Sequence, residues 1–231
     1  RLGRIIDYLE QAGELDNTLI VVISDNGSSG EGGPNGTFNE WRFFNGLADS
    51  TDLVLEHIDE LGTPASNNHY NTGWAWALDT PFPYWKRWAG YEGGTADLCL
   101  VSWPDRIAPS TEVRHQYVHA VDVVPTIYEL LDITPPAVIN GYEQLPIEGQ
   151  SFAPAISDPT APSKSTQFFT MLGQRAIYHD GWLACTVHPP LSSWGHFDQD
   201  EWELYHLDVD RSQSTNLAAA EPERLAAMTA L

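Results

Sequence analysis

The sequence predicts an α/β fold that is followed, toward the C-terminal end, by a small α+β part. A helical pattern at 2–12 leads directly into an unbroken apolar run at 18–23, and a second apolar run follows at 98–103. Residues 166–187 then alternate in the manner of a β-hairpin, and a helical pattern begins near Glu221. Strands followed by a helix are typical of an α+β unit.

The first predicted helix rests on four apolar residues at the spacing of one helical face, namely Leu2, Ile5, Ile6 and Leu9. Gly13 stands where such a helix would end. The run at 18–23 suits a parallel strand that is buried on both faces, and 98–103 is expected to be a second interior strand. Because ligands bind at the carboxyl ends of strands in open α/β sheets, Asp25 and Asn26 are candidate site residues.

The connecting segments differ in character. Residues 35–72 are polar and rich in Asn and Gly, which predicts a long excursion over the site with one short helix at 52–61. A helix is expected at 122–131, with Asp122 as its N-cap. Residues 134–165 are rich in Pro, Ser and Asp and predict a surface linker. The hairpin is expected to turn at His179-Asp180-Gly181, and a further strand is expected at 202–207.

The composition excludes two classes of partner. With 32 acidic and 11 basic residues the formal net charge is -21, so the chain would repel both nucleic acid and anionic membranes. It has no run of about 18 apolar residues, so a soluble protein is expected, and the sequence leaves its compartment, cytoplasm or periplasm, open. The chain opens at Arg1 inside a helical pattern, so further sequence is expected upstream. Cys99 and Cys185 lie in apolar surroundings, which favours two buried thiols over a disulfide.

Asp25 and Asn26 place a carboxylate and an amide carbonyl side by side on a loop that begins at a rigid strand. Such hard oxygen donors suit Ca²⁺ or Mg²⁺, whereas a soft metal would call for Cys or His. The alternative is an ordinary Asp-Asn-Gly turn without a ligand.

Lys86 follows two prolines in an aromatic setting that includes Tyr84, Trp85 and Trp88. A cation in a partly dry pocket stabilises an anionic group far better than one in open water. The alternative is a surface lysine whose apolar stem lies along its neighbours, with Arg87 beside it.

Three further groups of residues are weaker candidates. His115 and His119 precede Asp122, but no Cys or second acid completes a metal cluster, so a structural role is favoured. His69 and Tyr70 could line a substrate pocket or lie on a surface loop. Four tryptophans could form an aromatic substrate wall, although core packing is favoured for them; these are Trp74, Trp76, Trp85 and Trp88.

Several segments together resemble the type I sulfatases. The matching motifs are Ser-Asp-Asn-Gly at 24–27, Thr-Pro-Phe at 80–82, Lys86, Glu-Gly-Gly-Thr at 92–95, Val-Ser-Trp-Pro at 101–104 and Asp-Val-Val-Pro-Thr-Ile at 122–127. Residues 73–82 and 139–149 are most similar to the large bacterial arylsulfatases. Residues 202–208, with Asn216-Leu217, are similar to the C-terminal motif of the family. The resemblance spans nearly the whole chain.

The resemblance implies an alkaline-phosphatase-like α/β/α sandwich, present in part. Residues 1–150 would be the C-terminal part of its large α/β domain, and residues 151–231 a small C-terminal α+β subdomain with an antiparallel sheet. By position, Asp25 and Asn26 would bind a calcium ion. Lys86 would contact the sulfate group of a small-molecule sulfate ester, with an aryl sulfate as the expected substrate.

The family's nucleophile is a formylglycine, which is made from Cys or Ser in a Cys/Ser-x-Pro-x-Arg motif. Neither Cys99 nor Cys185 is followed by that pattern, and the segment that begins at Ser157 has Ala161 in place of the Arg. The resemblance therefore places the formylglycine, the family's paired aspartates and its catalytic histidine upstream of Arg1. A hydrated aldehyde oxygen would attack sulfur while Ca²⁺ and Lys86 neutralise the sulfate oxygens.

Two alternatives to the sulfatase remain open. One is a phosphodiesterase or phosphonate hydrolase of the same superfamily, whose metal pair more often has His after the Asp, where this chain has Asn26. The other is a non-catalytic module that binds a sulfated or polysaccharide ligand through its Trp-rich loops. The chain also departs from many sulfatases at Ala96 and Leu98, where an Arg and a Pro are common.

Overall fold

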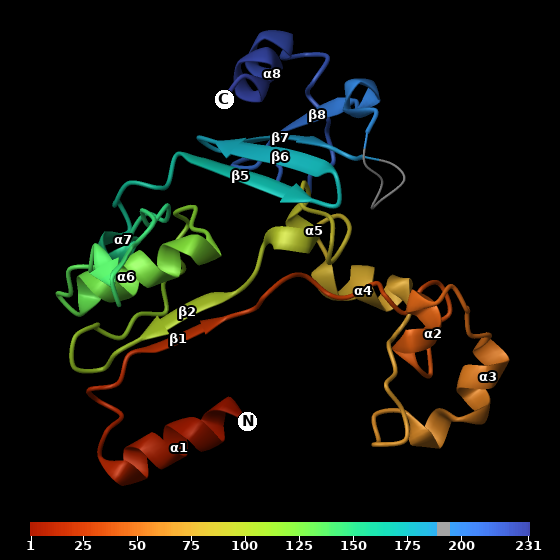
Figure 1. Ribbon diagram of the computed structural model, residues 1–231, viewed down its shortest axis with the longest axis horizontal. Helices are drawn as coiled ribbons and strands as arrows, with labels where there is room; N and C mark the ends of the chain where they lie inside the picture. The colour runs from red at the N-terminus through yellow and green to blue at the C-terminus, as the bar shows by residue number, and fades with distance from the viewer. Residues whose placement is uncertain (189–194) are drawn as a thin grey trace. The chain divides into compact units, whose positions relative to one another are not determined.

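The structure is a computed structural model, and it describes residues 1–188 and 195–231 (Figure 1). These residues form two compact units, and each unit consists of two separate chain segments. Unit 1 contains residues 1–23 and 98–167, and unit 2 contains residues 24–97 and 168–231. The chain therefore leaves unit 1 directly after its first strand and returns to it just before its second.

Unit 1 begins with the predicted helix, α1 (Leu2–Ala12). It ends at Gly13, which takes the left-handed conformation with φ 71°, and the Gly13 N–H donates to the carbonyl of Glu10. Glycine adopts this conformation without the steric cost that a Cβ would bring. The helical spacing and the position of the stop are both confirmed.

Strand β1 (Ile20–Ile23) pairs with β2 (Cys99–Ser102) in an antiparallel register that places Ile20 opposite Ser102 (Figure 1). The predicted parallel arrangement is therefore wrong for this pair. An unbroken apolar run indicates burial on both faces, but it carries no information on the direction of the neighbouring strand. Nor are the strands buried in the described chain, because Ile23 is 47% and Leu100 50% exposed.

Unit 1 also contains a helix at the place where one was predicted, residues 122–131. The 3-10 turn η2 (Ala120–Asp122) leads into α6 (Val123–Leu130). Asp122 occupies the N-cap position of α6, but its buried carboxylate accepts hydrogen bonds from the N–H groups of His119 and Gln150. The apolar residues Val123, Ile127 and Leu130 are only partly buried, and Leu131 is 41% exposed.

The predicted linker has some regular structure. Two short strands, β3 (Val138–Ile139) and β4 (Tyr142–Glu143), form a hairpin, and α7 (Ala153–Ser157) follows. Most of the other residues between 134 and 150 are exposed, as expected for a surface segment.

Unit 2 contains a four-stranded sheet in the order β5-β6-β7-β8 (Figure 1). The strands are β5 (Thr166–Met171), β6 (Gln174–His179), β7 (Trp182–Thr186) and β8 (Trp202–His206). The β6–β7 and β7–β8 pairs are antiparallel. The predicted turn is confirmed, because Asp180 and Gly181 both have positive φ between β6 and β7.

The core of this sheet is covered by the C-terminal helix α8 (Pro222–Thr229) (Figure 1). The buried residues of this core are Ile177, Ala184, Leu204 and Met228. Leu204 is fully buried, and Trp182, Trp202 and Leu225 pack around the cluster. The sequence therefore predicts a sheet with a helix against it, but the central strands are covered on both faces, because the consecutive residues Ala176, Ile177 and Tyr178 are all buried.

The other segment of unit 2, residues 24–97, includes the predicted excursion at 35–72. It contains α2 (Glu40–Phe44), α3 (Thr51–Glu56), η1 (Ile58–Glu60), α4 (Thr72–Asp79) and α5 (Glu92–Thr95), and a short turn, η3 (Phe197–Gln199), precedes β8. The helix expected at 52–61 is thus split into α3 and η1. Trp74 and Trp76 on α4 are 62% and 53% exposed, so the core packing expected for them is wrong.

The sheet of unit 2 holds the segment that leads into α5. The side chain of Gln213 accepts from the Glu92 N–H at 2.7 Å and donates to the Gly90 carbonyl at 3.0 Å. Gln174 donates to the carbonyl of Arg87 at 2.9 Å, and the Tyr91 hydroxyl donates to a carboxylate oxygen of Glu203 at 2.6 Å. Buried amide side chains from the sheet region therefore fix the backbone beside Lys86.

Two other expectations have clear outcomes. Neither Cys99 nor Cys185 forms a disulfide, and Cys185 is buried as predicted, but Cys99 is exposed on β2. Among the helices of the described residues, none has the length and apolar character that a membrane crossing requires.

Candidate active site

The loop after β1 carries the predicted metal ligands. Asp25 is exposed and Asn26 is half-buried. The Asn26 side-chain N–H donates to the Gly27 carbonyl at 3.0 Å, which orients the amide group. The loop is anchored two residues later, because the Ser28 N–H donates to both carboxylate oxygens of Asp79 at 2.9 and 3.1 Å.

Carboxylates gather around this loop. Burial raises the pKa of Asp97, the negative charges of Asp25 and Asp79 raise it further, and a hydrogen bond with Ser24 opposes them. The arrangement thus concentrates negative charge beside two hard oxygen donors, which fits a divalent cation such as Ca²⁺.

The described residues do not form a complete metal site. Among them, no group of three or more His, Cys, Asp or Glu side chains is arranged to hold a metal ion. Calcium usually takes about six to eight oxygen ligands. Asp25 and Asn26 could therefore supply only part of such a shell.

Lys86 lies on a segment that is hydrogen-bonded to the same loop. The backbone N–H of Lys86 donates to the backbone carbonyl of Ser28 at 3.0 Å, and Ser28 lies two residues after Asn26. Tyr84 stacks on Trp88 with ring centroids 4.2 Å apart, so the aromatic setting expected from the sequence is present. The structure thus brings the backbones of the two predicted site segments together in unit 2.

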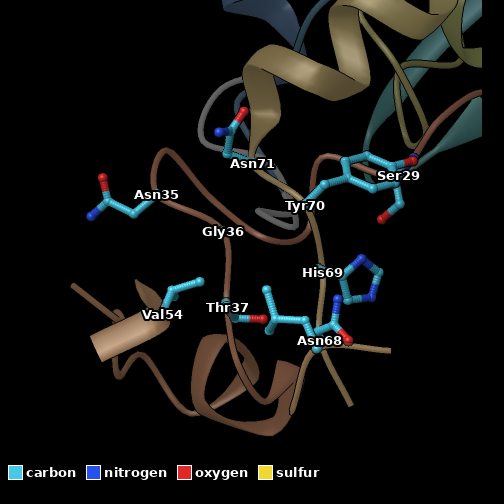
Figure 2. A pocket seen from close by; sticks show the side chains of 10 residues that line it. Ser29, Asn35, Gly36, Thr37, Val54, Asn68, His69, Tyr70 and Asn71 are labelled. Atoms are coloured by element: carbon cyan, nitrogen blue, oxygen red, sulfur yellow. The ribbon is translucent and has the colours of Figure 1, made fainter. Parts of the chain in front are cut away.

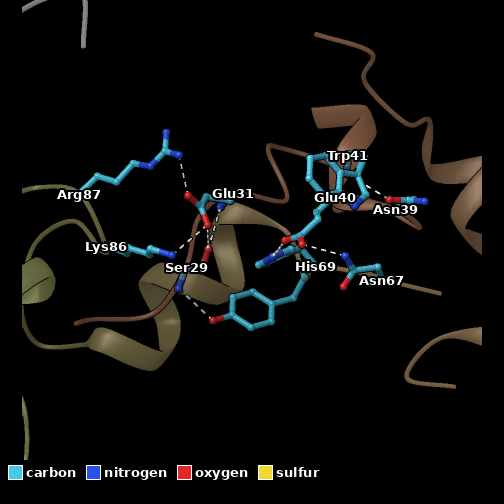
Figure 3. A network of polar contacts seen from close by, with 10 residues as sticks. Ser29, Glu31, Asn39, Glu40, Trp41, Asn67, His69, Lys86 and Arg87 are labelled. Atoms are coloured by element: carbon cyan, nitrogen blue, oxygen red, sulfur yellow. Dashed lines mark hydrogen bonds and ion pairs between the residues drawn. The ribbon is translucent and has the colours of Figure 1, made fainter. Parts of the chain in front are cut away.

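The ammonium of Lys86 is part of an ion-pair network centred on Glu31 (Figure 3). Lys86 Nζ lies 3.1 Å from Glu31 Oε2, and an Arg87 guanidinium nitrogen lies 2.6 Å from Glu31 Oε1. The Ser29 hydroxyl donates to Oε2 at 3.0 Å. The Glu31 side chain is 10% exposed and that of Lys86 is 35% exposed, so the lysine is accessible from solvent.

This network carries a surplus of positive charge. Burial by itself would raise the pKa of the Glu31 carboxyl, but hydrogen bonds from Lys86 and Ser29 and the charges of Arg87 and Lys86 hold it below its usual value. With Glu31 ionised, two cations share one carboxylate. A net charge of about +1 in a half-buried setting favours an anionic ligand.

Sequence reasoning missed Glu31, Arg87 and Asp79 as members of this region. Arg87 was treated only as a neighbour of Lys86, and Glu31 lies 55 residues from Lys86 along the chain. Asp79 accepts a hydrogen bond from the backbone N–H of Ser28, which lies 51 residues away along the chain. The signal for Glu31 was a single acidic residue inside a glycine-rich loop, which alone indicates no partner.

A cavity of about 440 Å³ adjoins the network (Figure 2). Its lining residues are Ser29, Asn35, Gly36, Thr37, Val54, Leu61, Asn68, His69, Tyr70 and Asn71. His69 and Tyr70, for which the sequence left a substrate pocket and a surface loop open, both line this cavity. The Tyr70 hydroxyl accepts from the Ser29 N–H at 3.1 Å, and a ring nitrogen of His69 lies 2.7 Å from a carboxylate oxygen of Glu40.

Of the two histidines before Asp122, His119 has a structural role. A ring nitrogen of His119 accepts from the Val121 N–H, and the His119 N–H donates to Asp122. These two contacts form a capping box at η2.

The chain contains one Ser-x-Pro-x-Arg segment, at 102–106. Ser102 is the last residue of β2, and Arg106 donates to the carbonyl of Leu130 at 3.0 Å. The Arg106 guanidinium also lies 4.4 Å from the ring centroid of Trp103. These contacts explain the segment as the end of a strand and the turn that follows it in unit 1.

The fold and the charged loops define an α/β protein with an anion-attracting site beside an oxygen-rich loop. A family model described as Sulfatase matches residues 1–133. The chain belongs to the sulfatase family.

Two curated relatives extend the likeness. An uncharacterized sulfatase of Schizosaccharomyces pombe is 29% identical over 97% of this chain and 38% of its own length. The arylsulfatase of Klebsiella aerogenes is 25% identical over 66% of this chain and 31% of its own length. The chain thus spans less than two fifths of the curated relatives it matches.

A solved structure shows the same fold. A sulfatase connected with the metabolism of multiple glycosaminoglycans by Bacteroides thetaiotaomicron superposes with a TM-score of 0.60 at 17% identity. The match covers 99% of this chain and 40% of the other. The expected alkaline-phosphatase-like fold, with an antiparallel sheet at the C-terminal end, is confirmed.

Proposed function

We propose that this chain contributes calcium ligands and a sulfate-binding lysine to an enzyme that hydrolyses sulfate esters, with aryl sulfates as the substrate class. Membership of the sulfatase family supports the reaction type. The name of the Klebsiella aerogenes relative, an arylsulfatase, supports the substrate class. The observation that carries the proposal is the hydrogen bond from the backbone N–H of Lys86 to the backbone carbonyl of Ser28. This bond joins the segment that carries the lysine to the loop that carries Asp25 and Asn26.

Asp25 and Asn26 would hold the cation through a carboxylate oxygen and an amide oxygen. When bound, Ca²⁺ would supply positive charge to the sulfate oxygens. The orientation of Asn26 suits this role, because its N–H side already donates to Gly27 and its oxygen remains for a ligand. The charges of Asp79 and Asp97 beside Asp25 would add to the attraction for the cation.

Lys86 would hold a sulfate oxygen by a charge-assisted hydrogen bond. Its partner in the structure, Glu31, is shared with Arg87 and Ser29, so the ammonium can turn toward a substrate while Glu31 keeps other donors. A sulfate ester carries one negative charge, which matches the surplus of one positive charge in the Glu31 network. The nucleophile is proposed to be a formylglycine that residues outside this chain supply.

The test uses the full-length gene product and matched pairs of sulfate and phosphate esters. Hydrolysis of the sulfate ester in preference to the phosphate ester is expected, and the opposite preference would favour the phosphodiesterase interpretation. Binding of the sulfate ester without turnover would favour a non-catalytic module.

A variant tests the role of Lys86 in the same assay. Lys86→Ala is expected to lower kcat by about 10²- to 10³-fold, the usual effect of losing one such donor. Arg4→Ala is the control, because Arg4 is an exposed cation on α1 in unit 1. Unchanged turnover in Lys86→Ala would remove this lysine from the site.

A further inference from the structure

We propose that the cavity lined by Thr37, Asn68 and His69 binds the organic part of the substrate, and that this part is a ring bearing hydroxyl groups. The inference rests on the proposed function, because it assigns a binding site to the alcohol or phenol part of the sulfate ester, which is the leaving group of the proposed hydrolysis. A volume of about 440 Å³ lies within the range of ligand sites in proteins.

Thr37 is the first observation that points to a ligand. It is 2% exposed, and in the part of the chain that the structure describes its hydroxyl has no hydrogen-bond partner. It lines this cavity (Figure 2). It also lines a neighbouring cavity of about 230 Å³. A buried hydroxyl without a partner is unfavourable, so a ligand that supplies one gains a hydrogen bond at no loss to the protein.

The amides of the cavity wall are the second observation. The side-chain oxygen of Asn68 accepts from the Gly62 N–H at 2.8 Å, and that of Asn71 accepts from the Trp74 N–H at 3.0 Å. Among the described residues, neither NH₂ group has a protein hydrogen-bond partner. The wall therefore offers amide donors together with a hydroxyl that can donate or accept, which matches ligand hydroxyl groups.

One wall of the cavity is held rigidly. One carboxylate oxygen of Glu40 lies 2.7 Å from a ring nitrogen of His69. The other oxygen accepts a hydrogen bond from the side-chain amide of Asn67 at 2.7 Å. Backbone hydrogen bonds in both directions, each of 3.0 Å, join Thr37 to His69. Such preorganisation reduces the entropy lost when a ligand binds.

Ser29 links the cavity to the charged network. It lines the cavity, and its hydroxyl donates to the same Glu31 oxygen that Lys86 contacts. Figure 3 shows Ser29 and Lys86 on the same Glu31 carboxylate. A ring in the cavity would therefore carry its sulfate group toward the lysine. This contact gives the cavity its place in the proposed reaction.

The test compares two esters that differ by one ring hydroxyl, 4-nitrophenyl sulfate and 4-nitrocatechol sulfate, with the full-length gene product. Thr37→Val removes the hydroxyl and nearly keeps the volume. We expect kcat/KM for 4-nitrocatechol sulfate to fall roughly 2- to 10-fold, the worth of one hydrogen bond, and kcat/KM for 4-nitrophenyl sulfate to stay unchanged. An equal effect on both esters, or none on either, would overturn the inference.

A matched control separates recognition from folding. Thr126 is also 2% exposed, but its hydroxyl donates to the Asp122 carbonyl at 2.7 Å and accepts from the Phe152 N–H at 2.9 Å. Thr126→Val should therefore lower Tm and leave the preference between the esters unchanged. Thr37→Val should not lower Tm, because it breaks no hydrogen bond within the described chain.

A binding measurement keeps the inference separate from the proposed reaction. Free 4-nitrocatechol, which carries no sulfate, is titrated into the wild type and Thr37→Val. Tighter binding to the wild type by a similar factor supports the cavity assignment even if neither ester is hydrolysed, in which case only the proposed function fails. Equal binding, or none, overturns the assignment.

Discussion

The backbone of Gly27 lies directly against the carbonyl group of Gly93. A Cβ at Gly27 would stand 1.7 Å from the Gly93 oxygen, a distance that no side chain can occupy. The Gly27 N–H also donates to the Gly94 carbonyl at 3.3 Å. The loop that carries Asp25 and Asn26 is thereby packed onto α5, and glycine is the residue that permits it.

Gly27→Ala is expected to destabilise the protein by about 1–3 kcal/mol, because the added methyl group forces the two backbones apart. Thermal denaturation of the full-length product measures the change. Gly3→Ala is the control: a Cβ there meets nothing within 4 Å, and Ala in helix α1 should stabilise by about 0.5–1 kcal/mol. Equal Tm values for the two variants would contradict the close contact.

The Glu31 network predicts a pH dependence. The folded state holds the pKa of Glu31 below its usual 4.5, so the ion pairs stabilise the protein above about pH 4.5 and are lost as pH falls through the lower, folded value. Glu31→Gln should therefore lower Tm most at pH 6–7, with a difference that shrinks toward pH 3.

The control for Glu31 is an exposed pair. Glu112 is 73% exposed beside Arg114, and pairs of this kind contribute little. Glu112→Gln should change Tm only slightly at any pH. A Glu31→Gln difference that is constant from pH 7 to pH 3 would show that the carboxylate is not stabilised in its ionised form.

Asp25→Asn tests the metal assignment without turnover. Calcium is expected to raise the Tm of the wild-type full-length product, since a ligand that binds only the folded state stabilises it. Removal of the carboxylate should abolish most of that shift. Asp59→Asn, at an exposed position in η1, should keep it. A full calcium shift in Asp25→Asn would exclude Asp25 as a ligand.

Leu204→Ala should cost about 2–5 kcal/mol, because Leu204 is fully buried between the sheet and α8 and its loss leaves a cavity. Leu145→Ala, at a residue that is 90% exposed, should change stability by less than about 0.5 kcal/mol. Urea denaturation of both variants provides the comparison. A small effect at Leu204 would mean that the β7–β8 region is loosely packed.

The features that the sequence predicts correctly are local ones. The helix stop at Gly13 and the turn at Asp180-Gly181 depend on neighbouring residues and on positive φ values that glycine allows. The aromatic setting of Lys86 is local as well, since Tyr84 and Trp88 lie within two residues of it.

The features that were missed depend on partners far along the chain. The antiparallel pairing of β1 with β2 is decided by a strand almost 80 residues away, which the apolar run at 20–23 does not encode. The ion pair between Glu31 and Lys86 and the anchoring of Ser28 by Asp79 likewise join residues more than 50 positions apart. Cys99 is exposed because β2 has no covering layer within the described chain.

The amide of Gln213 binds the backbone at Glu92, 121 residues earlier in the chain. During translation, residues 24–97 emerge long before Gln213 is made, so the segment around Lys86 cannot reach its final packing until the last part of this chain has left the ribosome. A nascent chain that stops before Gln213 would therefore lack the two hydrogen bonds that tie the backbone at Gly90 and Glu92 to the C-terminal part of the chain.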